Sequence, residues 1–97
     1  MALINVAGLH NKKRSERIFL TLNPKWALGN DDRQWIIYRW RGGTKGWRPR
    51  AFVATSKMVL RRVLGELGAN PTQQAKRALD HFPENFKKWR SECAEEQ

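Results

Sequence analysis

Residues 33–54 of this 97-residue chain read RQWIIYRWRGGTKGWRPRAFVA. Residues 33–41 are rich in β-branched and aromatic side chains, which favour a strand. The glycine-rich residues 42–46 predict a turn, and residues 47–54 predict a second strand. Pro49 places that strand at a sheet edge or at a bulge, because proline has no N–H to donate to a neighbour. The stretch therefore predicts an antiparallel hairpin with a basic, glycine-rich tip.

The residues before this hairpin predict less regular structure. Residues 17–22 carry an apolar side chain at every second position, which is typical of a strand. Residues 3–6 give a weaker signal for another short strand. Asn, Gly and Asp are frequent in residues 23–32, so we expect a loop there, with Trp26 and Leu28 folding back onto the core.

Three helices are expected after the hairpin. Thr55 or Ser56 is a natural N-cap for a helix that ends at Leu67, with Gly68 as its terminator. A second helix is expected to begin with Pro71 in its first turn. A third follows Pro83, and we expect the chain to fray from residue 92 to residue 97. The buried faces predicted for these helices are Leu60, Val63, Leu64 and Leu67; Ala75, Ala78, Leu79 and Phe82; and Phe86, Trp89 and Cys93.

The order of these elements predicts one α+β domain that covers residues 1–97. Its fold is a three-stranded antiparallel sheet followed by two to three helices packed on one face. Residues 1–16 form a flexible basic arm in this scheme, and Lys12, Lys13 and Arg14 carry its charge.

The positive charge is concentrated in one part of the chain. The net charge is +10; residues 1–62 carry 14 Lys and Arg against 3 Asp and Glu, whereas residues 63–97 carry 5 against 6. A basic region joined to a neutral one indicates a single basic binding face, although a solvated charged surface would give the same composition.

The hairpin places aromatic and basic side chains together. Centring it on Thr44 pairs Ile36 with Phe52, Tyr38 with Arg50 and Trp40 with Arg48. Trp35, Ile37, Ala51 and Val53 then share the face that meets the helices. Arginine can contact phosphates or guanine in bidentate fashion, and aromatic rings contact bases and sugars. Cross-strand packing of arginine on aromatic rings, without any ligand, is the alternative. The candidate nucleic-acid-binding residues are Arg39, Arg41, Lys45, Arg48, Arg50, Tyr38, Trp40 and Trp47.

Residues 33–67 resemble known DNA-binding modules in their order of elements. The strand at 33–41, the turn at 42–46, the Trp47-Arg-Pro-Arg50 segment and the following helix are similar to the three-stranded sheets with a helix of AP2-type plant factors and of the N-terminal domains of phage and transposon integrases. The W-x-x-Y-R and W-R-x-x-x-F-V patterns also resemble small unassigned proteins of bacterial prophages. The resemblance implies DNA binding and a phage or prophage setting, but it supplies no catalytic residue.

No enzyme, metal or cofactor is expected. Asp31 and Asp32 suit a turn, Ser56 suits an N-cap, and His81 suits a cap or a surface position. The single Cys93 excludes an intramolecular disulfide and favours a reducing, cytoplasmic compartment. No signal peptide or membrane span is predicted.

Three functions remain open from the sequence. The first is binding of nucleic acid, with duplex DNA favoured over RNA, through the Arg- and Trp-rich hairpin. The second is a phage-type inhibitor or adaptor that binds an acidic surface of a host protein, since Trp, Tyr and Arg are also enriched in protein interfaces. The third is a structural or assembly protein.

Overall fold

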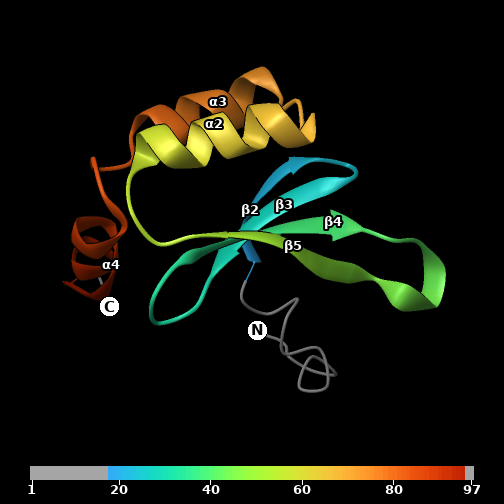
Figure 1. The fold of residues 1–97 in the computed structure, drawn as a ribbon, viewed down its shortest axis with the longest axis horizontal. Coiled ribbons are helices and arrows are strands. Elements are labelled where there is room, and N and C mark those ends of the chain that lie inside the picture. Colours follow the sequence, from blue (N-terminus) through green and yellow to red (C-terminus); the bar gives the residue numbers. More distant parts are fainter. Residues whose placement is uncertain (1–17, 96–97) are drawn as a thin grey trace.

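The computed structural model describes residues 18–95, with side chains described as far as Glu92. The strand predicted at residues 3–6, the basic arm at residues 1–16 and the side chain of Cys93 lie outside the described residues. The described chain forms two layers, an antiparallel sheet and a set of helices (Figure 1). The predicted α+β class is therefore confirmed.

The sheet has four strands rather than the three predicted. Their order is β2-β3-β4-β5, so each strand pairs with its neighbour in the sequence, and β2 and β5 form the two edges. The strands are β2 (Ile18–Asn23), β3 (Trp26–Asn30), β4 (Trp35–Trp40) and β5 (Trp47–Val53).

The additional strand, β3, was expected to be a loop. It pairs with β2 on one side and β4 on the other, and Trp26 and Leu28 point toward the helices while Ala27 lies on the far face. Gly29 and Asn30 weaken the local preference for a strand, but pairing on both sides satisfies the backbone hydrogen bonds of this segment. Tertiary pairing therefore overrides its loop-like composition.

The three helices are α2 (Lys57–Leu67), α3 (Gln73–Asp80) and α4 (Phe86–Glu95). Helix α2 has the predicted caps: the hydroxyl of Ser56 accepts a hydrogen bond from Val59 N, and Gly68 is left-handed with φ 71°. A short η1 turn (Gly43–Lys45) connects β4 with β5.

Helices α3 and α4 depart from the predicted ends. Thr72 caps α3, and its hydroxyl accepts a hydrogen bond from Ala75 N, so the helix starts two residues after Pro71, which was expected in its first turn. Asn70 adopts a positive φ of 53°, a left-handed conformation that cannot belong to a right-handed helix, so α3 begins after it. Helix α4 remains helical to Glu95, past the expected fraying point at Glu92.

The helices cover one face of the sheet, as predicted. In Figure 1, α2 and α3 lie side by side above the strands; α2 packs near β5 and α3 near β2. Leu60, Leu64, Ala75 and Leu79 are buried there, while Val63, Leu67 and Phe82 pack at the edge of the same core. The smaller cluster on the other face contains Ala27, Ile36 and Tyr38, with Ile18 and Trp47 beside it.

Trp35 joins the sheet to the C-terminal helical segment. Its side chain is fully buried; its ring stacks on Phe82 at 5.6 Å and meets Phe86 and Trp89 edge-on at 5.3 and 5.9 Å. Phe19 of β2 completes the group, with its ring 4.9 Å from that of Trp89. These rings provide much of the burial available to so small a domain.

Asn23 connects the β2–β3 turn to the linker between α2 and α3. Its Oδ1 accepts hydrogen bonds from Lys25 N (2.8 Å) and Trp26 N (3.0 Å). Its Nδ2 donates to the carbonyls of Ala69 (2.5 Å) and Asn70 (2.9 Å). Because both donors and both acceptor directions of the amide are used, no other side chain can replace it without losing a partner.

We expect Asn23→Asp to lower the free energy of unfolding by about 2–3 kcal/mol. The carboxylate keeps the turn but turns an acceptor toward two carbonyl oxygens that now lack donors. Asn85→Asp is the matched control: the Oδ1 of Asn85 accepts from Lys88 N at 2.8 Å, a role that a carboxylate fills equally well. Urea denaturation of both variants measures the difference, and equal stabilities would contradict the role given to Asn23.

Candidate nucleic-acid interface

The β4–β5 hairpin has the predicted register only where it lies under the helices. Ile36 pairs with Phe52 as expected, but toward the tip Tyr38 pairs with Pro49. A β-bulge between these pairs leaves Arg50 as the additional residue on β5. The bulge lies next to Pro49, which cannot donate to β4, and on the edge strand where a proline is tolerated.

The bulge changes the cross-strand neighbours of the predicted site. Trp40 pairs with Trp47 rather than with Arg48, and Arg48 pairs with Arg39. The predictions of the Tyr38–Arg50 and Trp40–Arg48 pairs are therefore wrong, since each supposed a uniform register across the whole hairpin. Two aromatic residues now lie opposite each other, and so do two arginines, so no arginine of the predicted site pairs across the strands with one of its aromatic residues.

Glycines shape the tip of the hairpin. The backbone N–H groups of Lys45 and Gly46 both donate to the Gly42 carbonyl, at 2.9 and 3.1 Å, and Arg41 N donates to the Gly46 carbonyl at 2.9 Å. Gly42 and Gly46 have φ values of 94° and 63°, a region that disfavours other residues. The turn is thus closed by its own backbone, and it leaves the side chain of Lys45 exposed.

The hairpin exposes a set of cations that have no acidic neighbours in sequence. Residues 33–62 contain no Asp or Glu. The ion pairs found within residues 18–95 join Arg61 to Asp80 at 2.8 Å and Arg90 to Asp32 at 3.2 Å, and neither involves the hairpin cations. The exposed hairpin cations are Arg39, Arg41, Lys45, Arg48 and Arg50.

Three of these arginines surround a hollow. Arg39, Arg41 and Arg50 line a space of about 570 Å³ together with Trp40. The guanidinium of Arg39 also lies 5.3 Å above the ring of Trp26, a cation–π contact that holds the side chain at the sheet surface. Arg50, the additional residue at the bulge, is one of the residues that line this hollow.

The predicted aromatic contacts divide into exposed and buried residues. Trp40 is 39% exposed and meets Trp47, which is half-buried, edge-on at 5.3 Å. Tyr38 is only 1% exposed and belongs to the small cluster on the far face. Its prediction as a contact residue is wrong in this conformation, because the ring has no free face for a ligand.

Phe52 is a candidate that the sequence prediction missed. It is 56% exposed, and its partner Ile36 lies on the face away from the helices. The expected alternation along residues 47–54 already placed Phe52 opposite Ile36, which was the available signal. The helices cover only the other face of the sheet, so Phe52 stays exposed.

The remaining polar candidates have structural roles in the described chain. Asp31 Oδ1 accepts hydrogen bonds from Arg33 N and Gln34 N, as a turn residue does, and Ser56 caps α2. His81 is exposed at the C-terminal end of α3. Residues 18–95 contain no cluster of His, Cys, Asp or Glu side chains suited to a metal ion.

No helix within residues 18–95 is long and apolar enough to cross a membrane. The comparisons with family models, with curated proteins and with solved structures find no match for this chain. The resemblance to three-stranded DNA-binding modules and to prophage proteins therefore stays a prediction.

Replacing Trp40 and Trp35 by alanine separates a surface tryptophan from a core one. We expect Trp40→Ala to cost about 1 kcal/mol of stability, because it removes one edge-on ring contact from a partly exposed site. Trp35→Ala should cost about 3–5 kcal/mol, since it empties the centre of the aromatic cluster. Thermal and urea denaturation give both values. A loss at Trp40 as large as that at Trp35 would contradict the exposed position of Trp40.

Proposed function

We propose that this protein binds nucleic acid, with duplex DNA as the preferred form, through the tip half of the β4–β5 hairpin. The observation that carries the proposal is the group of five exposed cations on this hairpin, none of which is ion-paired within the described chain. The group consists of Arg39, Arg41, Lys45, Arg48 and Arg50. A cytoplasmic setting belongs to the same proposal.

The position of the hairpin supports access to a polyanion. Its tip extends beyond α2 and α3 to one end of the molecule, and α4 lies at the opposite end (Figure 1). The acidic partners Asp32 and Asp80 belong to the β3–β4 connection and to α3, outside the hairpin. Positive potential is therefore concentrated at the projecting end, where it attracts phosphates most strongly.

The shape of the tip favours duplex DNA over duplex RNA. A two-stranded ribbon fits the wide major groove of B-DNA, whereas the major groove of A-form RNA is too narrow for side chains to enter. Arg41, which directly follows β4, and Arg50 of β5 are suited to phosphates or to guanine edges, and the exposed ring of Trp40 is suited to sugars or thymine methyl groups. The glycines of the turn permit close approach of the backbone.

An acidic surface of a host protein is a second candidate for this hairpin. The observation that favours it is the exposure of Phe52 and Trp40, at 56% and 39%, beside the arginines. Exposed aromatic rings next to arginines are typical of the centres of protein interfaces. Such a complex would depend less on salt than one built on phosphate contacts, because no condensed counterions are released.

Salt dependence tests the proposed DNA binding directly. If the hairpin neutralises four to five phosphates, log affinity for a random-sequence duplex should fall against log salt with a slope of about −4. Fluorescence anisotropy at several salt concentrations measures this slope. Absence of binding at low salt, or affinity indifferent to salt, would contradict the proposal and favour the protein partner.

Paired charge variants test whether the hairpin is the site. Arg41→Gln with Arg48→Gln should reduce the slope by about 2 and weaken binding, because two phosphate contacts are lost. Lys87→Gln with Lys88→Gln removes the same charge from exposed positions on α4, at the opposite end of the molecule. Equal effects of the two double variants would show that net charge, and not the hairpin, determines binding.

A further inference from the structure

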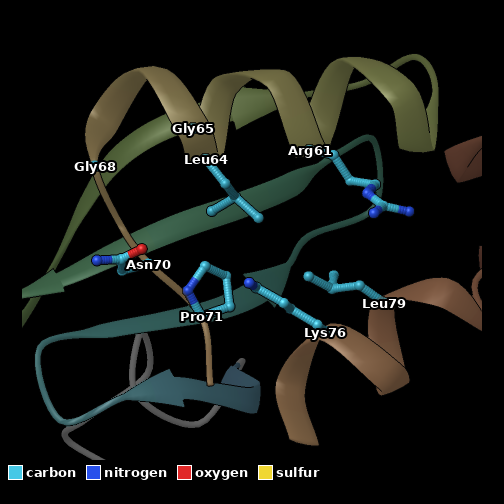
Figure 2. Close-up of a pocket in the computed structure, with 8 residues that line it drawn as sticks. All are labelled: Arg61, Leu64, Gly65, Gly68, Asn70, Pro71, Lys76 and Leu79. Atoms are coloured by element: carbon cyan, nitrogen blue, oxygen red, sulfur yellow. The ribbon is translucent and has the colours of Figure 1, made fainter. Parts of the chain in front are cut away.

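A second hollow lies between α2 and α3, away from the hairpin cations. It has a volume of about 330 Å³, within the lower range of small-molecule sites. Figure 2 shows that the side chains of Leu64 and Leu79 point into it from the two helices, and that Lys76 extends across it toward Pro71. The apolar side of the cleft is formed by Leu64 and Leu79, which pack into the core and are each only 3% exposed.

The two ends of this cleft are bounded by different parts of the chain. The α2–α3 linker, with Asn70 and Pro71, lines one end, and Arg61 lies at the other (Figure 2). Arg61 of α2 is ion-paired with Asp80 of α3 at 2.8 Å, so the two helices are bridged at that end. A short cleft bounded in this way fits a small molecule better than a peptide chain, which would need to extend past both ends.

Gly65 lines the cleft on the α2 side. It lies within the helix, has no positive φ, and a Cβ built there would meet no atom within 4 Å. No turn or close packing therefore requires glycine, and alanine would stabilise the helix better. Gly65 lines the cleft, so there is room for a larger side chain at this position to extend into it.

The polar groups of the cleft favour an anion. Arg61 is already paired with Asp80, but Lys76 is exposed and forms no ion pair within the described residues. Figure 2 shows the Lys76 ammonium beside Pro71, whereas the Asn70 carboxamide lies on the far side of that ring. We propose that the α2–α3 cleft binds a small aliphatic carboxylate, with its tail along the apolar lining at Leu64 and Leu79 and its carboxylate on the Lys76 ammonium.

Octanoate is the probe for this site, and the amide signals of Gly65 and Gly68 in ¹H–¹⁵N NMR spectra are the reporters. We expect saturable shifts at these amides and at Lys76, with a dissociation constant on the order of 1 mM for a ligand of this size. Octylammonium should bind more weakly, because it has the same tail and the opposite charge. Shifts that do not saturate, or that fall on the hairpin arginines instead, would overturn the proposal.

Gly65→Leu should fill the cleft and weaken octanoate binding more than tenfold, while its melting temperature stays at or above that of the parent. Glu66→Leu, an exposed change at the next position, is the control and should bind normally. Unchanged octanoate binding by Gly65→Leu would overturn the proposal. Its DNA binding should be unaffected, which distinguishes this site from the proposed hairpin function.

Lys76→Met provides an independent test should Gly65→Leu fold poorly. It should remove the preference for octanoate over octylammonium, and Lys88→Met on α4 should retain it. A preference that survives in Lys76→Met would show that the ammonium does not bind the carboxylate, and the proposal would fall.

Discussion

The structure depends on the burial of Trp35 at the junction of sheet and helices. This residue belongs to a central strand, yet its ring contacts Phe82, Phe86 and Trp89, which come from the last third of the chain. A 97-residue domain has few large contacts with which to offset the entropy of ordering its chain. The aromatic cluster concentrates part of that burial around Trp35, where the α3–α4 connection and α4 pack on the sheet.

This asymmetry explains why the β4–β5 hairpin projects with exposed cations. The helices cover the half of the β4–β5 hairpin that contains Trp35 and Val53, and both side chains are buried. Beyond that cover the same two strands carry arginines and an exposed tryptophan, because no apolar layer remains to pack against them. The projecting basic tip is thus a consequence of a helical layer too small for its sheet.

The hydrogen bonds of Asn23 and the bulge at Arg50 could not be predicted from the sequence and became visible only in the tertiary structure. Asn23 could be recognised as a strand end, but its hydrogen bonds to Ala69 and Asn70 join segments 46 and 47 residues apart. The bulge changes every cross-strand pair beyond Ile37. A one-residue shift between two strands does not alter the order of residue types within either strand, so the sequence pattern does not reveal it. Local sequence therefore gave the strands of the hairpin and the cations it carries, but not which residues face each other.

The sequence by itself determined the α+β class, the hairpin, the caps of α2 and the buried stripe of that helix. These features follow from periodicity, turn residues and capping, which act over a few neighbouring positions. Only the tertiary structure decided that Trp26–Asn30 is a strand, that Tyr38 is buried while Phe52 is exposed, and that Gly65 lines a cleft. Each of these depends on what lies opposite the residue in space, and strand pairing or helix cover supplies that partner from distant parts of the chain.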